Sequence, residues 1–205
     1  MPERRTRRKP RRHEQFASKK EAILNAAADL IVENGFENVS LADIARRLNV
    51  SKPTLYYYVE SKDQLLFELH EIGFAAVKTA LDAAQDSDRT GLERLEIFLR
   101  HYAEGGFTNF GRALVETGIR GLSPENEKRM RTRQRAADRM LENIIRDGVA
   151  DGSIDAQTDP AIAANYLFGA LNWIAYAPGD WSNLSPRKTA RDYVAVICAG
   201  LLPRA

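Results

Sequence analysis

A short run of hydrogen-bonding side chains between Lys52 and Tyr57 offers the clearest chemistry in this sequence. A lysine such as Lys52 can donate to guanine, and the methyl group of Thr54 can contact thymine. The hydroxyls of Tyr56 and Tyr57 can donate to phosphate. Leu55 interrupts the run and is expected to point inward, which leaves the polar side chains for a partner. These residue types in this order favour contact with double-stranded DNA.

The residues on either side of this run predict a helix, a tight turn and a second helix. Ser40 and Asp43 have the spacing of a capping box, in which each side chain bonds the other's backbone N–H. Asn49 follows this first helix, and asparagine tolerates the left-handed conformation that a sharp turn needs. Ser51 can cap the second helix, and Pro53 falls in its first turn, where a missing N–H costs little. A helix-turn-helix places such a second helix in the DNA major groove.

The stretch from Lys19 to about Phe74 resembles the DNA-binding domain of the tetracycline-repressor (TetR) family of bacterial regulators. By this resemblance the recognition helix is 52–58, and Ser40 and Lys62 also hold the DNA backbone. The family usually has His-Phe where this chain has Tyr58-Val59, and a core role and a DNA contact are equally compatible with Tyr58. The matching pieces are Ala22-Ile23-Leu24, Ala26-Ala27, Gly35-Phe36, Val39-Ser40-Leu41, Ile44-Ala45, Val50-Ser51-Lys52, Thr54-Leu55-Tyr56-Tyr57 and Ser61-Lys62-Asp63-Gln64-Leu65.

Positive charge is concentrated at the N-terminus, although the whole chain carries only +2. Residues 1–60 hold 12 Lys and Arg against 8 Asp and Glu, and the excess is densest in the first twelve residues. Residues 1–15 are expected to form a disordered basic arm, because they contain two prolines and no apolar pattern. The arm would either insert into the minor groove or act as a nonspecific electrostatic tether. Its DNA-binding candidates are Arg4, Arg5, Arg7 and Arg8.

The rest of the pattern predicts an all-α protein of about nine helices. Apolar residues recur at three- and four-residue spacing, without two-residue alternation. Cap residues precede proline at Ser123, Asp159 and Ser185, which marks three helix starts. We expect a helix-turn-helix domain over residues 16–62 and a larger effector-binding and dimerisation domain over residues 63–205. A long helix from Lys62 to about Ala84 would join the two domains.

The last two expected helices are the candidates for dimerisation. The segment from Pro160 to Tyr176 is apolar nearly all round, which predicts burial on more than one side. The family resemblance implies that it pairs with the helix after Pro186 and with their symmetry mates as a four-helix bundle. A two-fold dimer would bind a palindromic operator. The residues expected at the interface are Leu167, Leu171, Ile174, Tyr193, Val196, Ile197 and Leu201.

The resemblance also implies a ligand cavity among the middle helices, although plain core packing explains any single candidate equally well. The segment 169–173, followed by Tyr176 and Trp181, is similar to regulators of fatty-acid, steroid and acyl-CoA catabolism. The arginine-rich stretch 128–139 could receive CoA phosphates, but the favoured interpretation is a solvated helix face that is paired with Asp138 and Glu142 by helical spacing. The candidate pocket residues are Tyr102, Phe107, Phe110, Met140, Ile144, Phe168, Asn172, Trp173 and Tyr176.

Enzyme chemistry finds little support in the residues. There is no glycine-rich phosphate loop, His-Glu-x-x-His or Gly-x-Ser-x-Gly motif, so no catalytic residue and no cofactor is expected. One cysteine, Cys198, and three scattered histidines predict no metal site and fit a reducing cytoplasm. No run of eighteen apolar residues occurs, so no membrane span is expected.

The sequence therefore predicts a regulator that binds a palindromic operator as a homodimer. The usual behaviour of the family is repression released by a small hydrophobic ligand, and an acyl-CoA thioester is a candidate ligand. The main alternative is an architectural DNA-binding protein without an effector. A dimer that binds only other proteins is a further alternative.

Overall fold

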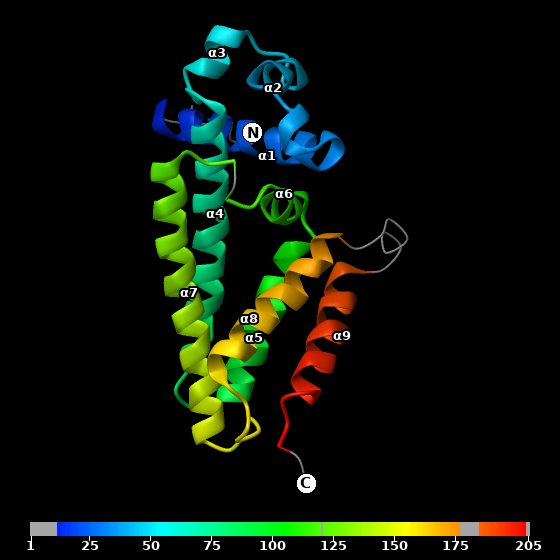
Figure 1. Ribbon diagram of the computed structural model, residues 1–205. Helices are drawn as coiled ribbons and strands as arrows, with labels where there is room; N and C mark the ends of the chain where they lie inside the picture. Colours follow the sequence, from blue (N-terminus) through cyan, green and yellow to red (C-terminus); the bar gives the residue numbers. More distant parts are fainter. Residues whose placement is uncertain (1–11, 120, 177–184, 204–205) are drawn as a thin grey trace, which may run out of the picture.

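The structure, a computed structural model, describes residues 12–119, 121–176 and 185–203, and in these ranges it is all-α (Figure 1). The prediction of nine α-helices is confirmed for this part of the chain. They are α1 (Arg12–Asn34), α2 (Leu41–Arg47), α3 (Lys52–Tyr56), α4 (Lys62–Ala83), α5 (Gly91–Gly106), α6 (Asn109–Thr117), α7 (Pro124–Ala150), α8 (Pro160–Asn172) and α9 (Pro186–Ala199), with 3-10 turns η1 (Phe36–Asn38) and η2 (Trp173–Tyr176).

The N-terminal domain is a small helical unit built from α1, α2, α3 and the first turns of α4. Its core contains Ile31, Ile44 and Leu55, which are almost completely buried. Leu65 and Leu69 of α4 belong to the same core. Because α4 contributes side chains to this domain and continues beyond it, the domain boundary falls within a continuous helix.

The C-terminal domain packs α5, α7, α8 and α9 around a second core. Phe98 and Leu99 of α5, Ile144 of α7 and Leu167 of α8 are among its most buried members. The lower part of α4 joins this core through Leu81. Figure 1 shows α4 and α7 side by side along one edge, with α5, α8 and α9 on the other.

Helix α6 lies between the two domains and packs against α1 (Figure 1). The connection from α6 to α7 is fixed to α4 at the level of the N-terminal domain. The Asp63 carboxylate accepts hydrogen bonds from the Ser123 backbone N–H at 2.6 Å and from Asn126 Nδ2 at 2.7 Å. The beginnings of α4 and α7 are therefore held together.

Two boundaries differ from the sequence-based expectation. Helix α1 begins at Arg12, so residues 12–15 are helical and do not belong to a disordered arm. Helix α8 ends at Asn172, and Trp173–Tyr176 form a 3-10 turn where a single helix to Tyr176 was expected. Residues 1–11 lie outside the described part of the chain.

Candidate DNA-binding surface and ligand cavity

The helix-turn-helix is stabilised by local hydrogen bonds at each of its corners. Ser40 and Asp43 form the expected capping box, and hydrogen bonds from Ser40 lower the pKa of the Asp43 carboxyl. Asn49 adopts a φ of 52°, which is the left-handed turn conformation. Ser51 Oγ accepts from the Thr54 N–H at 3.2 Å and caps α3. These bonds fix the angle at which α3 leaves the turn.

The short helix α3 presents the side chains that the sequence singled out. Leu55 is fully buried in the domain core, which orients the helix. Lys52 and Thr54 are exposed, and Tyr56 and Tyr57 are also largely exposed. The Thr54 hydroxyl lies 2.7 Å from Ser51 Oγ, so its methyl group is the part left for a base. These four residues form a continuous candidate DNA surface.

Tyr58 has a structural role that the sequence left open. It is half-buried against the domain core, and its ring lies 4.7 Å from the ring of Phe16. Phe16 also makes an edge contact with Tyr57 at 5.8 Å. These contacts fix the first turns of α1 beside α3. Arg4, Arg5, Arg7 and Arg8 themselves lie outside the described residues.

Ser40 and Lys62, the two expected contacts to the DNA backbone, are already engaged within the domain. The Ser40 hydroxyl lies 2.5 Å from Asp43 Oδ2. Lys62 Nζ donates to the Phe36 carbonyl at 2.6 Å and sits 4.1 Å from the centre of the Phe36 ring. Both side chains therefore stabilise helix starts, and Lys62 joins α4 to η1.

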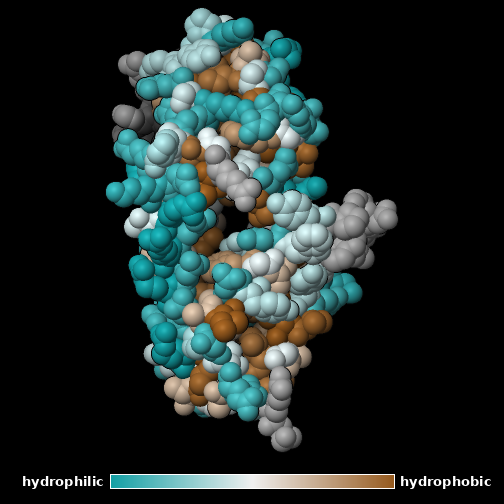
Figure 2. Space-filling view, in the orientation of Figure 1, coloured by the Kyte–Doolittle hydropathy of each residue, from teal (hydrophilic) through white to brown (hydrophobic). Residues whose placement is uncertain are grey.

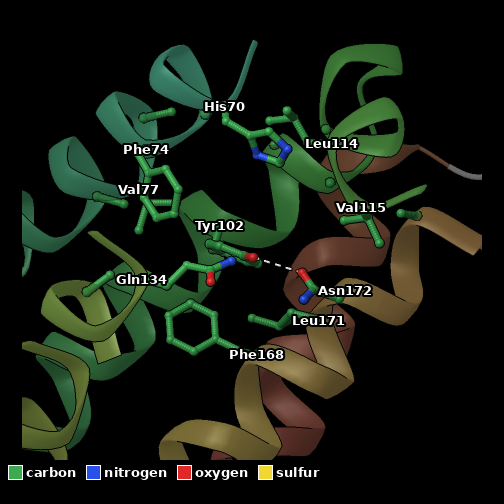
Figure 3. A pocket seen from close by; sticks show the side chains of 18 of the residues that line it. His70, Phe74, Val77, Tyr102, Leu114, Val115, Gln134, Phe168, Leu171 and Asn172 are labelled. Carbon is green, nitrogen blue, oxygen red and sulfur yellow. Dashed lines mark hydrogen bonds between the residues drawn. The ribbon is translucent and has the colours of Figure 1, made fainter. Parts of the chain in front are cut away.

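A cavity of about 560 Å³ lies between α4, α5, α6, α7 and α8. Its wall is mainly apolar, and Figure 3 shows Phe74 and Val77 of α4 facing Phe168 and Leu171 of α8 across it. Figure 2 shows the molecular surface hollowed beside α4 at the level of α6. A volume of this size suits a small organic molecule.

Two buried polar groups on the cavity wall are hydrogen-bonded. The Tyr102 hydroxyl donates to Asn172 Oδ1 at 2.8 Å (Figure 3), and burial, reinforced by the Asp138 charge, raises the pKa of Tyr102 to about 12. His70 Nε2 lies 2.7 Å from the Gly118 carbonyl oxygen, and burial lowers the pKa of His70. The cavity is thus bordered by a neutral phenol and a buried imidazole.

The α7 wall of the cavity is acidic. Gln134, Asp138 and Glu142 line it at successive helical turns. Burial, followed by the neighbouring Glu142 charge, raises the pKa of Asp138. No lysine or arginine lines the cavity within the described ranges. The sequence analysis missed this wall, because the alternating charges of α7 do not indicate which side of the helix faces inward.

The nine predicted pocket residues divide into three groups. Tyr102, Phe110, Phe168 and Asn172 line the cavity. Ile144 is fully buried in the C-terminal core, and Phe107 and Met140 pack against that core. Trp173 and Tyr176 are exposed because α8 ends before them. The Tyr176 hydroxyl instead donates to the Val115 carbonyl of α6 at 3.3 Å.

Three expected interface residues are unavailable to a second chain. Leu167, Leu171 and Ile174 are at most 3 % exposed and belong to the core of their own chain. Tyr193, Ile197 and Leu201 are partly buried against that core, whereas Val196 is 75 % exposed. The exposed apolar stripe of α8, η2 and α9 consists of Ile162, Tyr166, Trp173, Tyr176 and Val196. We call these five residues the α8–α9 face; hydrophobic colour is visible over the lower part of α9 in Figure 2.

The arginines of α7 make contacts away from the cavity. Arg129 lies over the Phe67 ring, 4.3 Å from its centre, and Arg133 pairs with Glu71 of α4 at 2.8 Å. Arg131 pairs with Glu127 one turn earlier on the same helix. The expected pairing with Asp138 and Glu142 is not found among the described residues, and Arg129 and Arg133 contact α4 instead.

Comparison with known proteins identifies the family. The family described as "Bacterial regulatory proteins, tetR family" matches residues 23–69, and "Tetracyclin repressor-like, C-terminal domain" matches residues 88–201. The chain belongs to the TetR family. It is accordingly a helix-turn-helix, DNA-binding transcriptional regulator, as the sequence predicted.

Individual relatives are distant but cover most of the chain. The HTH-type transcriptional regulator AqdR of Rhodococcus erythropolis is 29% identical over 156 residues, which are 75% of this chain and 72% of AqdR. The fatty acid metabolism regulator protein of Bacillus subtilis strain 168 is 21% identical over 151 residues, covering 73% of this chain and 78% of that protein.

Solved structures match nearly the whole described chain. PfmR from Thermus thermophilus is 28% identical, with a TM-score of 0.76 and coverage of 86% of this chain and 97% of PfmR. AibR in complex with isovaleryl coenzyme A and operator DNA is 25% identical, with a TM-score of 0.75 and coverage of 87% and 97%. Family members are regulators, and the relatives named here give no indication of an enzyme.

Among the described residues, no three His, Cys, Asp or Glu side chains are grouped so as to hold a metal ion. None of the described helices is both long and apolar enough to cross a membrane.

Proposed function

We propose that this protein is a homodimeric repressor that binds a palindromic operator and is released from it by a small hydrophobic ligand. The observation that carries the proposal is the position of Phe110 and Leu114 on α6. Both residues line the cavity, and both pack against the core of the N-terminal domain. A ligand that displaces these side chains would therefore act directly on the packing of the DNA-binding domain.

Hydrogen bonds on both sides of α6 support this route. On the DNA side, Asn109 Nδ2 donates to Asp29 Oδ1 of α1 at 3.0 Å. On the cavity side, Arg112 Nε donates to the Ala175 carbonyl at 3.2 Å. Helix α6 is therefore attached both to α1 and to η2, whose Ala175 borders the cavity.

The contact between His70 and the Gly118 carbonyl adds a second route, through α4. His70 lines the cavity, and Leu65 and Leu69, which precede it on α4, belong to the core of the N-terminal domain. A shift of α4 or α6 would change the spacing of two recognition helices in a dimer. By linkage, a ligand that favours the shifted state weakens operator affinity by the same coupling energy, typically ~1–3 kcal/mol.

The α8–α9 face supports the dimer. Its exposed aromatic and aliphatic side chains lie on the last helices, where the family resemblance implied a four-helix bundle. A two-fold dimer places its recognition helices about 34 Å apart, one turn of DNA. Because operators lie on the bacterial chromosome, the proposal implies a cytoplasmic protein.

An acyl-CoA is the effector class that the relatives suggest, because AibR was solved with isovaleryl coenzyme A. The apolar cavity could hold an acyl chain, but its described wall offers no basic side chain for the CoA phosphates. The proposal therefore specifies a small hydrophobic ligand.

Selection of binding sites from random duplex DNA at physiological salt tests the DNA part of the proposal. The expected result is a two-fold symmetric motif with half-sites one helical turn apart. Enrichment without a motif would contradict sequence-specific repression and favour an architectural DNA-binding protein. Failure to enrich any DNA would favour a dimer that binds only other proteins.

A further inference from the structure

The charges on the cavity wall select the chemistry of its ligand. Among the described residues of that wall, Asp138 and Glu142 are carboxylates, and there is no lysine or arginine to balance them. Neither carboxylate forms an ion pair within 4.0 Å with a described basic side chain. The wall also carries His70 and His101, and the charge of Arg139, which does not line the cavity, acts to lower the pKa of Asp138. No described lysine or arginine on the wall itself balances the two carboxylates.

The two carboxylates lie one helical turn apart on α7 and are both half-buried. Like charges at this spacing repel each other on a helix. Burial removes part of the water that would otherwise screen them. A ligand cation between the two carboxylates would offset both their mutual repulsion and the loss of screening water, whereas a ligand anion would add a third negative charge.

Aromatic rings complete the environment. Tyr102 lies close enough to Asp138 for that charge to affect its hydroxyl, and its ring packs against Phe168 with 5.4 Å between centres. Phe74 and Phe110 extend the apolar wall. Ring faces attract cations, and this attraction strengthens where water is excluded.

We propose that the effector of this cavity is a hydrophobic molecule with a cationic nitrogen, an amine or a quaternary ammonium, whose charge lies against Asp138 and Glu142. This inference rests on the proposed function, because it names the ligand class of the same cavity. It disfavours an acyl-CoA, since a thioester of CoA would bring only negative charge to the site.

A matched set of probes tests the inference: dodecylamine, dodecanol, dodecanoate and dodecanoyl-CoA, each below its aggregation threshold. Binding to the purified protein is measured by isothermal titration calorimetry, and release of the selected operator by fluorescence anisotropy. The amine is expected to bind most tightly. Asp138→Asn and Glu142→Gln should each lower the affinity for the amine by about tenfold, as expected for the loss of a charge-assisted hydrogen bond. The affinity for dodecanol should not change.

Glu125→Gln is the matched control, because Glu125 is exposed at the start of the same helix and does not line the cavity. It removes the same charge and should leave the amine's affinity unchanged. If Glu125→Gln lost as much affinity for the amine, the effect would come from the overall charge of the protein, and the inference would be overturned. Tighter binding of dodecanoate or dodecanoyl-CoA, or no binding of the amine, would also overturn it.

The two readouts separate this inference from the proposed function. Amine binding that depends on Asp138 but releases no operator would support the cation site and contradict ligand-controlled release. Operator release by the anionic probes alone would support ligand-controlled release and contradict the cation site.

Discussion

Two lysines near the DNA-binding surface have different surroundings, and their substitution should separate recognition from stability. Lys52 is exposed at the first position of α3, whereas Lys62 is bound to the Phe36 carbonyl and ring. Lys52→Met should cost about 1–3 kcal/mol of operator affinity and relax base preference at one position of each half-site. Binding curves on single-base operator variants would measure both effects.

The same substitution at Lys62 serves as the comparison. Lys62→Met should lower the free energy of unfolding by about 1–2 kcal/mol, because it removes a hydrogen bond and a cation–π contact. The salt dependence of its operator binding should match that of the parent protein. A flatter salt dependence would show that Lys62 neutralises a phosphate after all.

His70 should make stability depend on pH between about 7.5 and 5.5, a range that contains the usual histidine pKa. Burial lowers the pKa of His70 below its ordinary 6.5, so in this range the unfolded chain binds more protons than the folded chain. Folding stability therefore falls as the pH drops below 6.5. Thermal unfolding of His70→Gln, whose amide can still donate to Gly118, should show a smaller loss on acidification.

The exposed His101 provides the control for this measurement. His101→Gln should leave the acid loss of stability in place, because that loss is attributed to the buried His70. An identical loss of stability in the parent and in His70→Gln would show that other groups cause the acid sensitivity.

At the residue scale, local sequence signals were sufficient for caps but not for the cavity. Ser40 and Ser51 could be assigned as caps because each bonds an N–H only three residues away. Only four of the nine pocket candidates line the cavity, because aromatic residues suit a cavity and a core equally well. The carboxylates of α7 were missed because their inward side depends on contacts with distant helices.

At the scale of helices, the start of α5 lies in close contact with the end of α7. A Cβ added at Gly91 would lie 2.1 Å from the Gly148 backbone nitrogen. Gly91→Ala must therefore separate two helix backbones, and we expect a loss of about 1–3 kcal/mol or more. Chemical denaturation measures this loss.

Gly105, near the other end of α5, is the matched position, because a Cβ there meets nothing within 4 Å. Gly105→Ala should be neutral or stabilise the fold by up to about 1 kcal/mol through helix propensity. Equal destabilisation by the two substitutions would argue that α5 is sensitive to alanine for reasons other than its approach to α7.

The helix starts that proline marks were predicted correctly, whereas the start of α1 was not. The prolines at 124, 160 and 186 each occupy the first position of a helix, as expected. Ser18 and Glu21 also have capping-box spacing, yet α1 begins six residues before Ser18. Packing of Phe16 on Tyr57 and Tyr58 holds this extra length, and no local pattern shows such a contact.

At the scale of the whole molecule, the α8–α9 face is an apolar surface that is exposed in the single chain. A regulator that binds a palindrome needs two recognition helices, and each chain supplies one. Figure 1 shows α8 and α9 at the end of the molecule away from α3, so a dimer formed there would leave both recognition helices free. The sequence predicted that α8 and α9 are apolar, but it did not predict which of their apolar side chains lie in the core and which are exposed.

Val196→Asp tests this arrangement, because Val196 is 75 % exposed and its substitution leaves the chain's own core intact. In a two-fold interface the substitution occurs twice, and each unpaired carboxylate buried there should cost about 3 kcal/mol. Sedimentation should then show a folded monomer, with helical content and thermal stability of the separate chain preserved. Operator affinity should fall well beyond tenfold, because each monomer binds a half-site alone.

Ala136→Asp places the same charge on an exposed position of α7, away from the α8–α9 face. This variant should remain dimeric and bind the operator as the parent protein does, since a carboxylate in water needs no partner. Trp173→Asp is a second substitution on the α8–α9 face. If both Val196→Asp and Trp173→Asp remain dimeric, the α8–α9 face is not the interface. If Val196→Asp is monomeric yet binds the full operator with parental affinity, dimerisation and recognition are independent, and a palindromic operator no longer follows from the fold.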